Sequence, residues 1–213
     1  MYKSFVIVED FYPDPAEVRQ LALSGKFYDT DRYVGLDSDK KVFHPEIDNV
    51  VSHIVGEPVS GLVADDNNHG AFRVTLEGMK NEDYMAGIHV DSNTCYWAGI
   101  VYLTLPEDTP QGRLGTTFYR HKKYNIVRLP LNEAEEEAWG VTHDEMRKLV
   151  DIDGRDYSKW EYINEMPFAY NRLVLFRPWH FHDSGLNFGD KPENGRLIQT
   201  LFFQRGQQSQ AAN

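Results

Sequence analysis

From residue 70 onward the chain is a series of short apolar segments separated by turn residues, and this pattern constrains the fold most. Each segment is bounded by Gly, Pro, Asn or Asp, which are the residues that usually interrupt strands. Short strands joined by turns predict an antiparallel sandwich or barrel. The predicted strands are Ala71 to Leu76, Tyr96 to Leu105, Thr116 to Tyr119, Asn125 to Arg128, Arg172 to Phe176 and Leu197 to Phe203.

The beginning of the chain reads as a strand, a turn and a helix. Ser4 to Val8 is apolar and rich in β-branched residues, which favours a strand. Asp14 suits an N-cap and Pro15 suits the first helical position, so we expect a helix over Ala16 to Ser24. Gly25 is expected to end this helix.

Other helical segments are expected to flank the strands. Residues 26 to 66 read as irregular, except for a short helix from Pro45 to Val55. A helical stretch also interrupts the β-rich half, with a first segment over Glu133 to Trp139 and a second that Thr142 caps and that runs to Val150. The prediction is a mainly β chain with an α+β N-terminal part and flanking helices.

The length and composition fit one globular domain. The chain has 213 residues, of which 41% are hydrophobic and 26% charged, so it can bury a substantial core. We find no internal repeat and no low-complexity linker, and we expect a single domain over residues 1–213. The polar residues 206–213 are expected to form a flexible tail.

The net charge and the single cysteine narrow the partners and the compartment. A formal charge of −11 disfavours nucleic acid and anionic membranes as partners, because both require clustered cations. Cys95 is the one cysteine, so no intrachain disulfide forms and a reducing, cytoplasmic location is expected. The early apolar run Phe5 to Val8 is too short for a signal peptide or a membrane span.

The candidate chemistry lies in two histidine segments that are about ninety residues apart. One of the eight histidines, His89, is followed two residues later by an aspartate, Asp91, and residues at this spacing point to the same side of a strand. His182 follows a later apolar strand, and Arg196 opens the last strand. Two imidazoles and a carboxylate form the facial triad that suits non-haem Fe(II). An arginine nearby suits the far carboxylate of a chelating co-substrate.

Other site types are not supported by the sequence. It contains no Gly-x-Ser-x-Gly nucleophile elbow, no phosphate-binding Gly-rich loop and no dinucleotide fingerprint. A single cysteine excludes cysteine-rich zinc sites. Within the candidate triad one alternative stays open, because His180 shares a face with His182 and can take its place if the register differs.

In the order and spacing of these motifs the sequence resembles the Fe(II)/2-oxoglutarate-dependent oxygenase superfamily. The resemblance covers most of the chain and is greatest to prolyl-hydroxylase-like members and to an uncharacterised bacterial family of small proteins of this type. The segments that carry it are Val6 to Pro15, Gly87 to Asp91, Gly99 to Leu103, Gly115 to Tyr119, Leu175 to His182 and Gly195-Arg196.

The resemblance implies a fold, an activity and a set of site residues. It implies a double-stranded β-helix, or jelly roll, that hydroxylates a substrate with Fe(II), 2-oxoglutarate and O2 and releases succinate and CO2. The sequence differs from many prolyl hydroxylases in two ways. The basic residue that binds 2-oxoglutarate in that family is expected here at an arginine, and the loop that precedes this arginine is slightly long. The implied iron ligands are His89, Asp91 and His182, and the implied 2-oxoglutarate contacts are Arg196, Tyr102 and Thr116.

The substrate is expected to be a small molecule, an amino acid or a peptidyl group. Trp179 and His180 flank the expected mouth of the site, and Arg120 belongs to a basic cluster, so these three are candidate substrate contacts. Two other functions remain open at this point. One is a cupin-like metalloprotein that does not use 2-oxoglutarate, and the other is a metal-free jelly-roll binding module.

Overall fold

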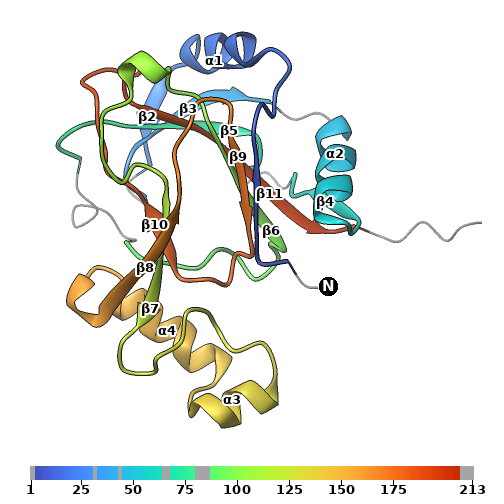
Figure 1. Ribbon diagram of the computed structural model, residues 1–213, viewed down its shortest axis with the longest axis vertical. Coiled ribbons are helices and arrows are strands. Elements are labelled where there is room, and N and C mark those ends of the chain that lie inside the picture. Colours follow the sequence, from blue (N-terminus) through green and yellow to red (C-terminus); the bar gives the residue numbers. More distant parts are fainter. Residues whose placement is uncertain (1–2, 31–32, 43–44, 64–67, 80–86, 207–213) are drawn as a thin grey trace, which may run out of the picture.

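A computed structural model describes residues 3–30, 33–42, 45–63, 68–79 and 87–206 of the chain. These residues form a mostly β structure with antiparallel sheets and four α-helices (Figure 1). His44 and the part of the predicted tail from residue 207 onward lie outside the described residues. No helix in the described part of the chain is long and apolar enough to cross a membrane.

The larger sheet contains eight strands, with the long strand β11 near its centre. Its path is β1-β9-β6-β11-β5-β3-β2, and β4 pairs with the far end of β11. The bounds are β1 Phe5–Val8, β2 Phe27–Asp29, β3 Leu36–Lys41, β4 Val59–Gly61, β5 Ala71–Thr75, β6 Trp97–Tyr102, β9 Leu173–Phe176 and β11 Arg196–Arg205.

Three further strands form the smaller sheet, in the order β10-β7-β8. They are β7 Thr116–His121, β8 Trp160–Met166 and β10 His182–Ser184. Phe118 and Met166 from this sheet pack in one buried cluster with Tyr102, Phe176 and Ile198 from the larger sheet. The two sheets therefore share a core on the inner face of the larger sheet.

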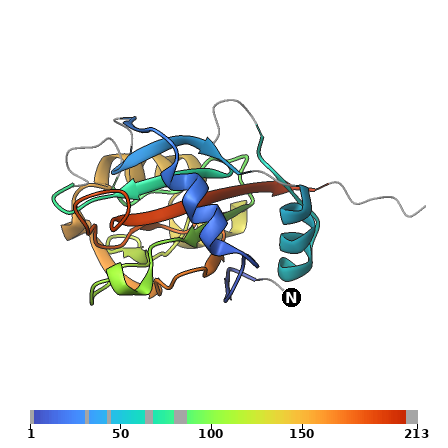
Figure 2. The same ribbon diagram turned by 90° about the horizontal axis from the view of Figure 1, so that it is seen from above.

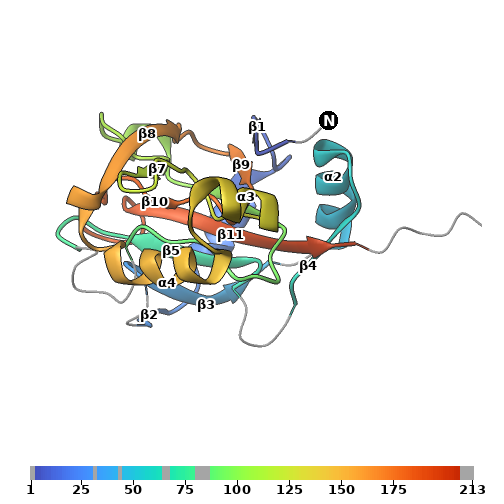
Figure 3. The same cartoon turned by 90° about the horizontal axis from the view of Figure 1, so that it is seen from below.

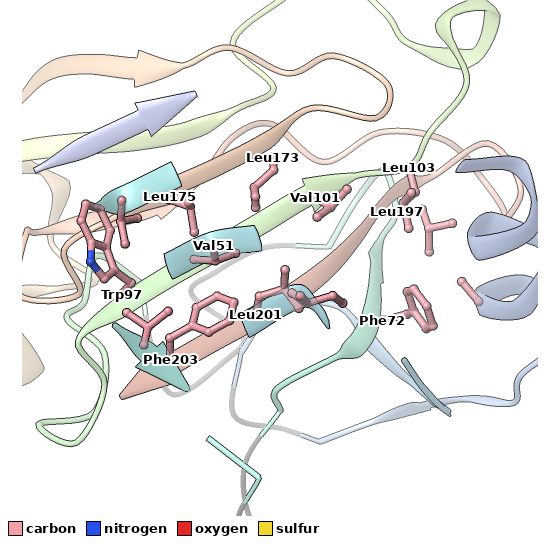
Figure 4. Close-up of a cluster of buried hydrophobic side chains, with 14 of the residues drawn as sticks. Val51, Phe72, Trp97, Val101, Leu103, Leu173, Leu175, Leu197, Leu201 and Phe203 are labelled. Carbon is pink, nitrogen blue, oxygen red and sulfur yellow. The ribbon is translucent and has the colours of Figure 1, made fainter. Parts of the chain in front are cut away.

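The outer face of the larger sheet is covered by two helices. Helix α1 (Pro15–Leu23) crosses the strands, as Figure 2 shows, and α2 (Pro45–Val55) lies beside β4. Ala22 of α1 and Val51 of α2 belong to one buried cluster with Leu201 and Trp97 of the sheet. Figure 4 shows Val51 over the sheet residues of this cluster. Successive side chains of β11 point to opposite faces of the sheet. Its odd-numbered apolar residues face this core, and its even-numbered residues face the smaller sheet.

Local signals account for the ends of α1. Asp14 accepts a hydrogen bond from the Glu17 amide at 3.1 Å, as the predicted N-cap should. The helix ends at Leu23, with Ser24 rather than Gly25 as its C-cap. A Cβ on Gly25 would lie 2.1 Å from the Ser38 hydroxyl, so this glycine is needed for the close approach of β3.

The helical insertion forms two short helices that pack on the smaller sheet (Figure 3). Asn132 caps α3 (Glu133–Trp139), and Gly140 ends it in the left-handed conformation at φ 64°. A capping box between Thr142 and Glu145 begins α4 (His143–Asp153). The apolar side of α4 contributes Met146 and Val150 to a third buried cluster.

The strand predictions for residues 71–76, 96–105, 116–119, 172–176 and 197–203 are confirmed in place. The strand predicted at residues 125–128 and the irregular region predicted at residues 26–66 are wrong. Residues 26–66 are not irregular, because β2, β3 and β4 form there beside the predicted helix. Asn125 to Arg128 is not a strand and forms only isolated bridges, since Asn125 takes a positive φ of 56° that breaks an extended run.

Candidate metal centre

A cavity of about 630 Å³ lies between the two sheets. Alternate residues of β11 line one wall of it, from Arg196 through Ile198, Thr200 and Phe202 to Gln204. The opposite wall comes from β7, β10 and the segment after residue 87. The inner face of the central strand therefore runs the length of this cavity.

Three potential metal ligands converge on this cavity. His89, Asp91 and His182 each offer one ligand atom, and these atoms all lie within 4.8 Å of one another. Reciprocal backbone hydrogen bonds join His89 to His182, at 2.9 and 3.0 Å. The Asp91 amide donates to the Pro178 carbonyl at 3.0 Å. The two distant histidine segments thus form one short antiparallel bridge that carries the cluster.

The backbone fixes the orientation of both imidazole rings. Nδ1 of His89 lies 2.7 Å from the Gly87 carbonyl, and Nδ1 of His182 lies 2.8 Å from the His180 carbonyl. Because a carbonyl oxygen can only accept, each Nδ1 must carry the proton. The neutral rings therefore present the lone pairs of their Nε2 atoms, which is the state that binds a metal.

Asp91 supplies the observation that most favours a cation at this place. Its Oδ2 is buried and has no hydrogen-bond partner among the described residues, and it lies 3.6 Å from Nε2 of His182. A buried carboxylate oxygen without a partner is costly unless a cation binds it. With two imidazole lone pairs beside it, the donor set fits a divalent metal ion.

Burial shifts the pKa of all three groups. Desolvation lowers the pKa of His89 and of His182 to about 4, and it raises the pKa of Asp91 to about 6. At neutral pH both imidazoles are therefore neutral and the carboxylate is ionised. This is the protonation state that metal binding requires.

Arg196 lies in the same cavity and is 2% exposed. Its Nε donates to the Leu114 carbonyl at 2.8 Å. Within the described residues no carboxylate forms an ion pair with it, although a guanidinium stays charged even where burial lowers its pKa, as it does here. A buried cation that faces a cavity is a receptor for an anion.

Thr116 and Tyr102 lie near Arg196 but in different positions. Thr116 lines the cavity, and its amide donates to the Tyr102 hydroxyl at 2.9 Å. The Tyr102 hydroxyl is also 3.0 Å from Oγ1 of Thr116. Tyr102 is fully buried and is not part of the cavity wall, so it holds Thr116 from behind.

The sequence matches the family of unknown function DUF6445 over residues 2–203. The chain belongs to this family. No curated protein matches the sequence.

Several solved structures are distantly similar to this DUF6445 chain. The non-heme alpha ketoglutarate dependent epimerase SnoN from nogalamycin biosynthesis is 14% identical, with 95% of this chain and 78% of that chain covered and a TM-score of 0.49. A prolyl-4-hydroxylase of Pseudomonas putida is 11% identical, covers 96% and 94%, and has a TM-score of 0.47. HygX from Streptomyces hygroscopicus, solved with iron bound, is 15% identical, covers 95% and 82%, and has a TM-score of 0.43.

The three candidate substrate contacts do not line the cavity of this DUF6445 protein. His180 packs against the Phe5 ring at a centroid distance of 4.8 Å, and its side chain is not among the group that can hold a metal. Trp179 packs against the cluster beneath α4. Arg120 donates to Glu161 at 3.2 Å on the exposed side of the smaller sheet.

Sequence reasoning missed a second polar group on the cavity wall. Asp37 of β3 and Arg73 of β5 face the cavity together with Tyr33. The sequence held one signal for them, because Arg73 is the single charged residue in the apolar strand from Ala71 to Leu76. A charge on the buried side of a strand marks a paired or functional group.

Proposed function

We propose that this protein is an Fe(II)- and 2-oxoglutarate-dependent dioxygenase that hydroxylates a small-molecule, amino-acid or peptidyl substrate. The observation that carries the proposal is the convergence of His89, Asp91 and His182 in one cavity with Arg196. Two nitrogen ligands and one carboxylate leave three coordination positions open, which suits Fe(II) with a bidentate keto acid and O2.

The residues of the site fit the metal. His89 and His182 would bind it through Nε2, because a carbonyl already holds each Nδ1 proton. Asp91 would bind it through Oδ2, which is buried without a partner in the described chain. Iron and 2-oxoglutarate, when bound, would supply the oxidative chemistry that hydroxylates a C–H bond and releases succinate and CO2.

The fit of 2-oxoglutarate depends on the far end of the cavity. Arg196 would pair with the carboxylate that is distant from the metal, and the Thr116 hydroxyl would lie beside it. Tyr102 would fix Thr116 from the second layer rather than touch the co-substrate. The two antiparallel sheets around a shared cavity also support the double-stranded β-helix that we propose for the fold.

The remaining tasks of the chain are to exclude water and to orient the substrate. Ile100, Ile198 and Phe202 give the cavity apolar walls next to the metal ligands. An apolar wall strengthens the electrostatic interactions of Arg196 and Asp91, because it keeps out the solvent that would screen them. The cavity volume of about 630 Å³ is that of a ligand site, and it leaves room for a substrate beside a five-carbon keto acid.

An anaerobic titration with Fe(II) and 2-oxoglutarate tests the proposal. The wild type is expected to retain one iron and to give the weak visible charge-transfer band of an iron–keto-acid complex. His89→Ala should lose both, whereas Arg196→Ala should keep the iron and lose 2-oxoglutarate affinity. His53→Ala is the matched control, because His53 is exposed on α2 and far from the cavity.

Two results would contradict the proposal. Iron retention without a band, unchanged by Arg196→Ala, would indicate a metalloprotein of the same architecture that does not use 2-oxoglutarate. No iron bound by the wild type would indicate a metal-free binding module.

A further inference from the structure

The cavity contains an ion pair that the proposed chemistry does not use. Arg73 of β5 and Asp37 of β3 lie opposite each other in the register of the two strands. Nε of Arg73 donates to Oδ1 of Asp37 at 2.5 Å, and Nη2 donates to Oδ2 at 3.0 Å. Their side chains are 14% and 6% exposed, so the pair is largely desolvated.

This pair lies on the metal side of the cavity. The guanidinium carbon of Arg73 is 5.4 Å from the centroid of the Tyr33 ring. The Tyr33 ring is in turn 5.2 Å from the imidazole of His89. Arg73 is thus connected through one aromatic ring to a candidate metal ligand, within reach of a molecule that lies beside the metal.

A buried ion pair does little for stability by itself. Removing two charges from water costs several kcal/mol, and apolar replacements of similar volume are often neutral or stabilising. The residue opposite Arg73 on β11 is Ile198, which is apolar. We therefore explain the pair by the guanidinium that it places on the cavity wall, and not by a contribution to the stability of the sheet.

The geometry of the pair leaves one edge of the guanidinium open. Asp37 occupies the edge formed by Nε and Nη2 and prevents the group from rotating. Within the described chain, Nη1 of Arg73 donates to no acceptor. Its N–H groups form a fixed donor edge on a wall of the cavity.

The charge balance of the cavity decides which acceptor this edge suits. Asp37 already neutralises Arg73, whereas Arg196 has no carboxylate partner among the described residues. A second carboxylate at Arg73 would lie close to the Asp37 carboxylate, whose Oδ1 is 2.5 Å from Nε of the same guanidinium. Like charges at such distances disfavour an anion, but a neutral carbonyl oxygen accepts the same hydrogen bonds without this repulsion.

We infer that Arg73, oriented by Asp37, binds an uncharged carbonyl oxygen of the substrate, as in an amide or a peptide bond. The inference rests on the proposed function, in that it assigns Arg196 to the co-substrate and Arg73 to the substrate. The lining of the cavity also includes the uncharged residues Leu62, Ile100, Phe202 and Gln204. A carbonyl-bearing molecule with an apolar body fits both features.

Side-chain NMR of the two cavity arginines tests the inference in the metal-free protein. Arg73 and Arg196 guanidinium signals would be assigned with Arg73→Lys and Arg196→Lys, and the protein titrated with N-methylacetamide and with acetate. Arg73 should respond to N-methylacetamide more than to acetate. Arg196 is the internal control and should show the opposite preference, because it lacks a carboxylate partner in the described chain.

A second variant tests the role of Asp37 as a positioning residue. Asp37→Asn removes the neutralising charge and should raise the acetate affinity at Arg73 by about tenfold. A purely structural role would weaken both probes together. If this variant does not fold, the double change Asp37→Leu with Arg73→Met removes the pair without leaving a buried charge. N-methylacetamide should then no longer shift the ring signals of Tyr33, which contacts Arg73 in the wild type.

Three results would overturn the inference. They are a preference of Arg73 for acetate in the wild type, no change of preference in a folded Asp37→Asn variant, and no response of Arg73 to either probe. The proposed function is tested separately, because the double variant should keep the charge-transfer band with Fe(II) and 2-oxoglutarate. Loss of that band would assign Arg73 to the co-substrate instead.

Discussion

At the scale of single residues, the group of His89, Asp91 and His182 favours metal binding at a cost to the stability of the metal-free fold. Burial disfavours the ionised form of Asp91, whose pKa rises to about 6. Because its pKa is higher in the folded state than in the unfolded state, ionised Asp91 lowers the free energy of unfolding. This penalty is absent below its unfolded pKa and fully present above about pH 6.

Asp91→Asn is therefore expected to stabilise the metal-free protein and to abolish metal binding. The amide removes the buried charge, and its NH2 group can donate to Nε2 of His182. A shift of about two pKa units corresponds to at most ~3 kcal/mol in the free energy of unfolding at neutral pH. Urea denaturation with a chelator measures it, with the exposed Asp151→Asn as control. A less stable Asp91→Asn protein would contradict this reading.

Metal affinity should fall as the pH is lowered, because Asp91 and the two histidines take up protons. As the pH drops through about 6, Asp91 takes up a proton that the metal must displace, so the affinity should fall about tenfold per pH unit. The fall should steepen near pH 4, where both histidines also become protonated. Anaerobic Fe(II) titrations across this range measure the slope. An affinity that stays constant down to about pH 4, close to the ordinary pKa of an aspartate, would contradict it.

At the scale of elements, helix α4 contacts the candidate metal site through the side chain of Arg147. Nη2 of Arg147 donates to the Asp91 carbonyl at 3.1 Å, and Nη1 donates to Oδ1 of Asn93 at 2.8 Å. These contacts hold the backbone at Asp91 and the segment that follows it. The helical insertion therefore positions a candidate metal ligand, in addition to covering the smaller sheet.

Arg147→Gln is expected to weaken metal binding by about tenfold, the range typical of residues that orient a ligand without touching the metal. The Asp91 segment would lose both hydrogen bonds, while the ligands themselves remain. Isothermal titration with Mn(II) measures the change. Lys148→Gln, an exposed neighbour on the same helix, should bind Mn(II) as the wild type does. Equal affinity in the two variants would show that α4 does not position Asp91.

Elements with strong local signals could be predicted from the sequence, and elements made by pairing could not. Asn132 and Thr142 mark the starts of α3 and α4, and α2 has the predicted bounds. Strand β3 reads Leu-Asp-Ser-Asp-Lys-Lys and lacks apolar alternation, because it forms by pairing with β5 near the sheet edge. Strand β10 has three residues and exists through its register with β7.

At the scale of the whole molecule, the cavity depends on how closely the two sheets and their loops approach. A Cβ on Gly115 would lie 1.8 Å from the Met166 carbonyl, and one on Gly185 would lie 2.3 Å from the carbonyl carbon of Leu114. These glycines allow β7, β8 and the loop after β10 to meet behind Arg196. The Leu114 carbonyl that accepts from Arg196 belongs to this contact.

Gly115→Ala should therefore disturb the anion-binding end more than the metal end. Because Leu114 and Gly115 would have to move, Arg196 would lose its backbone acceptor, and 2-oxoglutarate affinity should fall by about tenfold or more. Iron affinity should stay near the wild-type value. Gly140→Ala is a comparison for backbone strain without a steric clash, because Gly140 has a φ of 64° and nothing lies within 4 Å of its added Cβ; its 2-oxoglutarate affinity should stay near the wild-type value. A parallel loss of iron would indicate general unfolding instead.

The site could be predicted from the sequence in part, for a reason that lies at this scale. His89, Asp91 and His182 carry motif spacing that the chain displays directly, and the structure brings them together. No motif spacing links Asp37 with Arg73, because their proximity arises from the pairing of β3 with β5. Chemistry that depends on tertiary register is visible only once the sheet is assembled.

The most direct test of the account is a crystal structure of the protein grown without O2 in the presence of Fe(II) and 2-oxoglutarate. We expect iron bound by Nε2 of His89, Oδ2 of Asp91 and Nε2 of His182, with the far carboxylate of 2-oxoglutarate on Arg196. Iron bound elsewhere, or 2-oxoglutarate anchored on Arg73 with Arg196 unengaged, would contradict it.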